Sequence, residues 1–110
     1  MKLRKRYLIF SIKSPSSYSM EEVRKAVVRE MRRTFGERCL ALSGLELIDY
    51  NEEKAVGIIR CYHTYLEHVR ATLALINNIK GVPVALYTLK VTGTRKKALS
   101  IAHSLHLKVR

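Results

Sequence analysis

The acidic side chains of this 110-residue chain are few and scattered, which bears on any metal-dependent chemistry. Asp49 is the only aspartate. Five glutamates fall at expected helix starts or in an expected turn: Glu21, Glu22, Glu67, Glu52 and Glu53. Metal-dependent phosphodiester cleavage needs several carboxylates that converge on one or two cations. We therefore expect no catalytic residue and no metal site in this chain.

Histidines offer general acid–base chemistry without a metal. His63 and His68 flank the start of an expected helix, and His103 and His106 are three residues apart near the C-terminus. Such a spacing is common by chance. Cys61 could join His63 and His68 at a zinc ion, but the paired spacing of zinc ligands is missing. We interpret the histidines as surface or partly buried side chains.

The two cysteines, Cys39 and Cys61, leave one question open. Two reduced thiols are the expectation for a reducing compartment, and a bridge between them stays an alternative.

The basic side chains are the dominant chemical signal, because they give a net charge of +12. They gather near the two ends, in a first basic segment (Lys2, Arg4, Lys5 and Arg6) and a second basic segment (Arg95, Lys96 and Lys97). A compact domain repels itself at such a charge, and the common reason for it is a polyanionic partner. Nucleic acid is favoured over an anionic membrane surface.

Targeting signals are not evident in the chain. Its apolar runs fall short of the roughly 20 residues of a membrane span, and the basic N-terminus lacks the cleavage site of a signal peptide. We expect a cytoplasmic protein with no membrane partner.

The elements that must position these side chains follow from apolar periodicity and turn residues. One helix is expected between the cap Ser19 and Gly36, and a second between the cap Thr64 and Gly81. Strands are expected at residues 6–13, 39–50 (interrupted near Ser43 and Gly44), 55–62 and 84–92, and a short last helix at residues 94–105.

This order predicts an α+β fold, a ferredoxin-like or RRM-like two-layer sandwich that forms one domain over residues 1–110. A four-stranded antiparallel sheet carries two helices on one face, and the short C-terminal helix is added to it. The first strand is central and pairs antiparallel with the last. The two basic segments are therefore expected to meet at one end of the sheet.

Two functions common on this architecture lack their motifs. Acylphosphatase needs a glycine-rich phosphate loop with an arginine after the first strand, where Ser14-Pro15-Ser16-Ser17 stands instead. RNA-recognition motifs stack bases on aromatic side chains of the third strand, and residues 54–61 hold no aromatic. The remaining mode of RNA binding is recognition of folded RNA through its phosphates and its shape.

The segment from Thr92 to Lys97 is the sharpest local signal. Gly93 lies between Thr92 and Thr94, and three cations open the helix that follows. The helix dipole favours acids at this end, so cations there indicate a bound anion.

The second expected helix carries more apolar residues than one stripe needs: Leu66, Val69, Leu73, Leu75, Ile76 and Ile79. We predict that they bind a protein partner as well as the core. The alternative is that the C-terminal helix covers them through Leu99, Ile101 and Leu105.

Three stretches together resemble the ribonuclease P protein component 2 family in its compact archaeal form. They are KRYL at residues 5–8, GIIRC at 57–61 followed by VRATLALI at 69–76, and VTGTRKKA at 91–98. The likeness spans nearly the whole chain, and the order and spacing of the blocks make it specific.

The resemblance implies a subunit of an RNA-based endonuclease that removes the 5′ leader of precursor tRNA. The RNA would hold the catalytic Mg²⁺, and the chain would bind no cofactor. Implied partners are ribonuclease P RNA, precursor tRNA, the TIM-barrel-like protein component 3 and the other protein subunits. Pairs of heterodimers with component 3 can join into a heterotetramer. The matching RNA contacts are Arg6, Arg60, Thr92, Gly93, Thr94, Arg95, Lys96 and Lys97. A ribosomal or tRNA-binding protein without a role in cleavage is the alternative.

Overall fold

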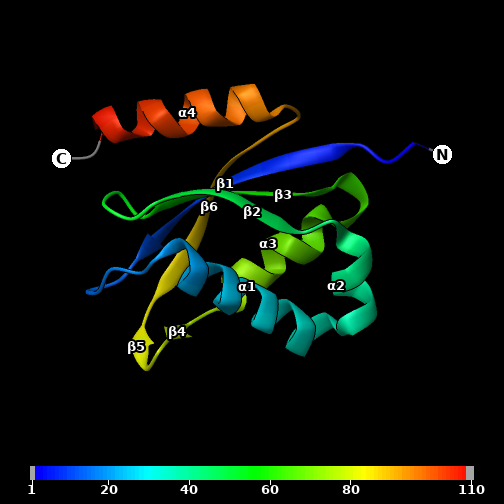
Figure 1. The fold of residues 1–110 in the computed structure, drawn as a ribbon, viewed down its shortest axis with the longest axis horizontal. Coiled ribbons are helices and arrows are strands. Elements are labelled where there is room, and N and C mark those ends of the chain that lie inside the picture. The colour runs from blue at the N-terminus through cyan, green and yellow to red at the C-terminus, as the bar shows by residue number, and fades with distance from the viewer. Residues whose placement is uncertain (1, 109–110) are drawn as a thin grey trace.

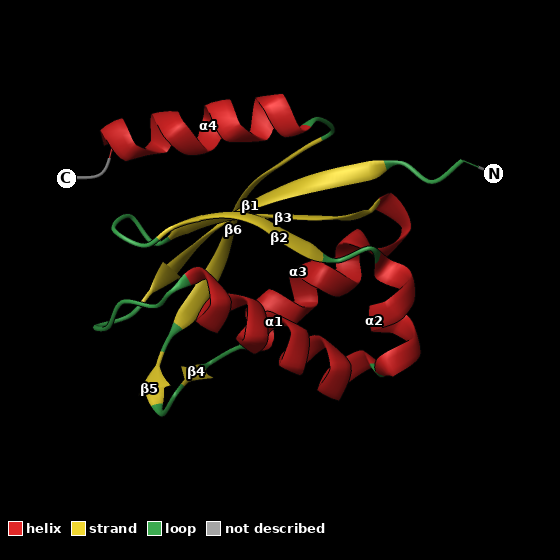
Figure 2. Ribbon diagram, in the orientation of Figure 1, coloured by secondary structure: helices red, strands yellow, loops and turns green. Residues whose placement is uncertain are grey.

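Four antiparallel strands form the central sheet, in the order β2-β3-β1-β6 (Figures 1 and 2). The computed structural model describes residues 2–108, with side chains to Leu105. The strands are β1 (Lys5–Lys13), β2 (Glu46–Asn51), β3 (Val56–Tyr62) and β6 (Ala85–Thr92), and the short β4 (Asn78–Ile79) and β5 (Val82–Pro83) form a separate hairpin. The helices are α1 (Met20–Phe35), α2 (Glu37–Ser43), α3 (Leu66–Leu75) and α4 (Arg95–Lys108), with a 3-10 turn at His63–Tyr65. This is the predicted ferredoxin-like sandwich.

The main core lies between the sheet and the helices α1 and α3. Leu8 and Phe10 of β1 and Ile59 of β3 point into it and are completely buried. Helix α1 contributes Val23 and Met31 at helical spacing. We call this side of the sheet the helical face.

The predicted start and end of α1 are confirmed. The backbone N–H of Glu22 donates to Ser19 Oγ (3.2 Å), and the N–H of Ser19 donates to Glu22 Oε1 (3.0 Å), which forms a capping box. Gly36 ends the helix at a φ of 94°, a conformation that L side chains rarely adopt.

The predicted strand at residues 39–50 is wrong in its first half, which forms α2. A short apolar run fits a helix as well as a strand, and here Leu40 and Ser43 turn inward at helical spacing. Gly44, in the left-handed region at φ 69°, ends α2. Cys39 therefore lies on a helix, and Cys39 and Cys61 are both free thiols. Burial raises the pKa of Cys61 to about 11.

The second predicted helix is shorter than expected. Thr64 lies in the 3-10 turn rather than at a helix cap, and α3 begins at Leu66 without a side-chain cap. The chain leaves the helix after Leu75 and turns through Lys80 and Gly81, both at positive φ. Ile76 and Ile79 still reach the main core, but from extended backbone.

Helix α4 lies on the opposite side of the sheet from α1 and α3 (Figure 1). Ala98 and Ala102 pack there against Ile9, Val56 and Ile58 in a second, smaller apolar cluster. The alternative in which this helix covers the second predicted helix is therefore wrong. We call this side the α4 face. Among the described residues, no helix is long and apolar enough to cross a membrane.

Candidate functional site

The two basic segments meet at one end of the sheet, as the topology predicted. Tyr7 pairs with Thr92 where β1 begins and β6 ends. A guanidinium nitrogen of Arg6 lies 3.9 Å from the position that a Cβ on Gly93 would occupy. Figure 1 shows the start of β1 beside the turn into α4. We call the first and second basic segments together the basic corner.

The turn from β6 into α4 is held by its own threonines. The hydroxyl of Thr92 donates to the carbonyl oxygen of Thr94 (2.9 Å), and Thr94 Oγ1 accepts from the N–H of Lys97 (3.2 Å). Thr92 is buried, whereas Gly93 and Thr94 are exposed. The first turn of α4 holds no acid, and Arg95, Lys96 and Lys97 are exposed. The helix start is thus capped internally and presents three cations to solvent.

The first basic segment is fastened to the end of β3. The N–H of Arg4 donates to His63 Nδ1 (3.1 Å), and the N–H of His63 donates to the carbonyl oxygen of Arg4 (2.7 Å). Lys2, Arg4 and Lys5 are exposed and Arg6 is partly buried. This link continues the β1–β3 ladder by one residue and positions the segment at the corner.

Ion pairs occupy the acids of the helical face, although among the described residues that face also carries cations without an acidic partner, such as Lys25. The acids of the helical face pair with cations of that face, as Arg24–Glu21, Arg32–Glu37, Arg33–Glu30 and Lys80–Glu22. The hydrogen bond from Lys80 lowers the pKa of Glu22. In the part of the chain that the structure describes, the seven cations of the corner have no such acid. The corner therefore carries uncompensated positive charge.

Arg60 is the one predicted RNA contact with an acidic partner. Its guanidinium lies 2.5 Å from a carboxylate oxygen of Glu46. Arg60 pairs in register with Tyr7, so it lies on the sheet beside the corner. Glu46 and Tyr7 were not predicted from the sequence. Their signal was the strand alternation, which puts Tyr7 on the opposite face from Leu8.

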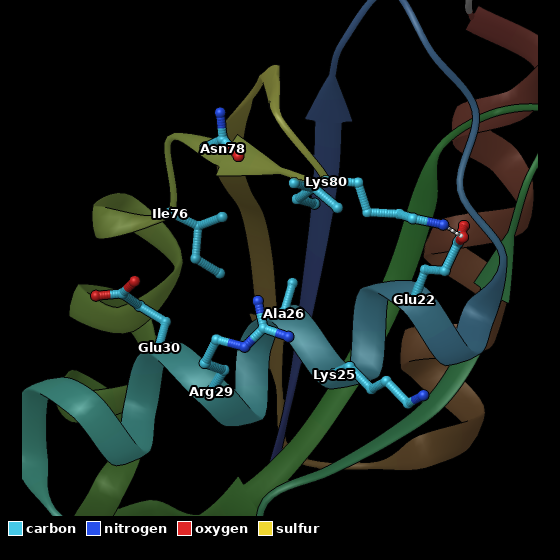
Figure 3. A pocket seen from close by; sticks show the side chains of 9 residues that line it. Glu22, Lys25, Ala26, Arg29, Glu30, Ile76, Asn78 and Lys80 are labelled. Atoms are coloured by element: carbon cyan, nitrogen blue, oxygen red, sulfur yellow. Dashed lines mark hydrogen bonds and ion pairs between the residues drawn. The ribbon is translucent and has the colours of Figure 1, made fainter.

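A second candidate is a groove of about 300 Å³ between α1 and β4 (Figure 3). Ala26, Ile76 and Ile79 contribute apolar surface, and Arg29 points toward it. Lys80 spans one side to reach Glu22. The groove is lined by both acidic and basic side chains, whereas the basic corner carries cations alone.

Among the described side chains, His63 and His68 make separate contacts rather than a pair with each other. The ring of His68 contacts Phe35 edge-on (4.8 Å between centroids) and Tyr65 (5.4 Å), and His63 is bound to Arg4. His103 is exposed on α4, and the side chain of His106 lies outside the described part. No three His, Cys, Asp or Glu residues cluster as metal ligands within the described residues.

The sheet face that stacks bases in RNA-recognition motifs is occupied here. Helix α4 covers its centre through Ala98 and Ala102, which pack on Ile9 and Ile58. Only the end of this face, near Tyr7 and Arg60, lies beside the corner.

The residues predicted to bind a protein partner divide into two groups. Val69, Leu73, Ile76 and Ile79 are 0–4% exposed and belong to the main core. Leu66 is partly buried against that core, and Leu75 is 49% exposed. The apolar surplus is thus used mainly by the core, and Leu75 is the member of the set most open to a partner.

A ferredoxin-like sandwich in which two basic segments meet at one end of the sheet is the class of protein that the structure defines. The family model described as "Rpp14/Pop5 family" matches residues 6–102. The chain belongs to this family.

Several relatives carry the name ribonuclease P protein component 2, among them proteins of Archaeoglobus fulgidus and Pyrococcus abyssi. The protein of Archaeoglobus fulgidus is 37% identical over 97 residues, 88% of this chain and 86% of its own. That of Pyrococcus abyssi is 34% identical over 92 residues, 84% of this chain and 78% of its own. A chain in the cryo-EM structure of yeast ribonuclease MRP has the same fold, with a TM-score of 0.67 at 14% identity, covering 98% of this chain and 93% of that one.

Proposed function

We propose that the chain is a protein subunit of ribonuclease P, the RNA-based endonuclease that removes the 5′ leader of precursor tRNA. Family membership across residues 6–102 carries this proposal. The chain contributes no catalytic group of its own. The Mg²⁺ ions of the reaction are bound by the RNA.

The basic corner is the surface that binds the catalytic RNA or its precursor tRNA substrate. Its seven cations have no acidic partner in the described chain, so phosphates would supply the missing charge. The exposed Gly93 and Thr94 allow a backbone to approach between the two segments, with Thr92 holding the turn beneath them, and Arg60 adds a guanidinium on the sheet. The corner binds and supports folded RNA through phosphate contacts.

The other partners are protein subunits of the same particle. Protein component 3 is the proposed neighbour, in pairs of heterodimers, with Leu75 and Leu66 the apolar residues of the predicted set that remain open to it. We place the particle in the cytoplasm.

Reconstitution tests the function. Ribonuclease P RNA and the remaining protein subunits are assembled with and without this chain, and leader removal from precursor tRNA is followed as Mg²⁺ is varied. We expect the chain to lower the Mg²⁺ requirement and to leave precursor tRNA intact when incubated alone. Cleavage by the isolated chain, abolished by His63→Ala or Asp49→Ala, would overturn the proposal. Equal binding of bulk tRNA or ribosomal RNA, with no effect on leader removal, would favour a general RNA-binding protein.

A further inference from the structure

One row of side chains crosses all four strands at the end of the α4 face. Glu46 of β2 pairs with Arg60 of β3, Arg60 with Tyr7 of β1, and Tyr7 with Thr92 of β6. Directly paired residues of antiparallel strands point to the same side, and Tyr7 contacts the cluster under α4. The row therefore lies on the α4 face, and its Tyr7 and Thr92 adjoin the basic corner.

Tyr7 is fixed in position but not enclosed. Its ring packs against the small cluster that Ala98 and Ile9 form, and the side chain is only partly buried. Its hydroxyl has no hydrogen-bond partner among the described residues. An aromatic side chain that is held on one side and open on another is suited to stacking with a planar group.

Arg60 lies next to this ring and is bound only weakly. Its side chain is 28% exposed, while that of its partner Glu46 is 53% exposed. An ion pair with so open a carboxylate is screened by water and is easily exchanged. A phosphate could replace Glu46, because guanidinium binds phosphate and carboxylate in the same bidentate geometry.

We propose that this row binds one unpaired nucleotide of the RNA. The Tyr7 ring stacks on the base, and Arg60 leaves Glu46 to pair with the phosphate beside it. A duplex keeps its bases stacked inside and offers only its phosphates to the basic corner. The row therefore makes the corner prefer RNA with an unstacked base, and this rests on the proposed function in that RNA is the ligand.

Two substitutions of Tyr7 test the stacking against two RNA probes, an oligouridylate and a perfect RNA duplex of the same length. Tyr7→Leu keeps apolar packing but removes the ring, and Tyr7→Phe keeps the ring. We expect Tyr7→Leu to weaken oligouridylate binding about 10-fold, the scale of one lost stack, and to change duplex binding less than twofold. Tyr7→Phe binds both probes as the parent chain does.

An equal loss on both probes with Tyr7→Leu, or no loss on oligouridylate, would overturn the stacking. If Tyr7→Leu does not fold, tyrosine fluorescence decides. Oligouridylate should quench the emission of the parent chain, and Tyr7→Phe should bind equally but lose that part of the quenching. Quenching that is identical in Tyr7→Phe contradicts the proposal.

Glu46→Gln tests the exchange of partners at Arg60, with Glu52→Gln as a control of equal charge change in the exposed turn. We expect Glu46→Gln to raise oligouridylate affinity several-fold more than Glu52→Gln does. The gain should vanish in the Arg60→Gln background. A gain that persists there would show a general charge effect and exclude the exchange.

These binding results are separable from the function of the particle. If the chain proves dispensable for leader removal while Tyr7 still discriminates oligouridylate from duplex, the proposed function fails and the nucleotide site stands. If the chain supports leader removal and Tyr7→Leu binds both probes normally, only the nucleotide site fails.

Discussion

The two faces of the sheet differ in both packing and charge. On the helical face, α1 and α3 bury a large cluster that includes Phe10, Met31 and Leu73, and the acids there pair with neighbouring cations. On the α4 face, a small cluster closes over two alanines, Ala98 and Ala102. Beside it lies the basic corner, whose cations have no acids in the described chain.

This difference separates stability from binding. Burial of apolar area on the helical face supplies most of the folding free energy, so substitutions there act on stability. The corner contributes charge that opposes folding, because like charges repel and cations oppose the dipole at the start of α4. Substitutions that remove positive charge from the corner should therefore weaken RNA binding and raise the stability of the fold.

The largest effect is expected inside the helical face, where α3 offers a matched pair. Leu73→Ala removes a side chain that is 1% exposed and should lower the free energy of unfolding by about 2–5 kcal/mol. Leu75→Ala changes a residue that is 49% exposed and should stay within about 0.5 kcal/mol. Urea unfolding measures both.

The same two variants test which of the predicted partner residues belong to the interface and which to the core. Leu75→Ala should weaken binding of protein component 3 in a titration of the purified subunits while the chain stays folded. An unchanged affinity would remove Leu75 from the interface, and equal destabilisation by the two variants would contradict the assignment of the core.

Charge reversal at the corner is expected to have the next largest effect. Changing Arg95, Lys96 and Lys97 to glutamate should reduce affinity for ribonuclease P RNA on the order of 100-fold and lower the slope of log K against log salt by about 2–3, as three phosphates lose their cations. The same change should raise the thermal midpoint, because acids favour the helix start.

The control has the same charge change on the helical face, with Lys25, Arg29 and Arg38 changed to glutamate. It should leave the salt slope nearly unchanged. Neutralising Lys2, Arg4 and Lys5 in the reversed variant should add much less than it does alone, since both segments bind one stretch of RNA. Strictly additive losses would indicate two separate sites.

Much of this comparison could be predicted from the sequence. The capping box at Ser19, the alternation of Leu8, Phe10 and Ile12 and the start of the last helix near Arg95 are local patterns, and the structure confirms them. The meeting of the basic segments followed from the order of elements, because in the ferredoxin-like pattern the first strand pairs antiparallel with the last.

The remaining features depended on tertiary contacts. Residues 39–43 form a helix because Leu40 packs on the main core, which a short apolar run cannot indicate. The apolar residues of the sequence keep helical spacing through Ile76 and Ile79, which predicted too long a helix. In the structure this stretch leads into a turn in which Lys80 has a positive φ. One feature of the sequence could have predicted that α4 covers the second face of the sheet. Ile9 and Ile58 make both faces of their strands apolar, which is typical of strands that are buried on both sides.

A moderate effect is expected at the small cluster under α4. Ala98→Leu places a larger side chain where Ala98 is completely buried, and overpacking of this kind costs about 1–3 kcal/mol. Because few side chains hold α4, we expect the helix to open locally, with amide exchange at residues 95–105 about 5- to 150-fold faster and exchange in β1 unchanged. Leu99→Ala, at a residue 41% exposed, is the control. Faster exchange throughout the sheet would show that the two faces unfold together.

The smallest effect concerns the ion pair beside the groove of Figure 3, where Lys80 binds Glu22 (2.6 Å). The hydrogen bond from Lys80 lowers the pKa of Glu22, and that bond raises the pKa of Lys80.

A carboxyl whose pKa is lowered by folding stabilises the protein above its unfolded pKa, about 4.3, and loses this contribution as the pH falls. A lysine whose pKa is raised contributes below about 10.4 and loses that contribution as the pH rises. Lys80→Met should therefore lower the thermal midpoint slightly at pH 7, and this deficit should shrink as the pH falls and Glu22 takes up its proton. Lys25→Met, which removes a cation without an acidic partner, should show no loss at pH 7. A deficit in Lys80→Met that persists unchanged at pH 2 would mean that the aliphatic part of Lys80, rather than its charge, stabilises this side of the helical face.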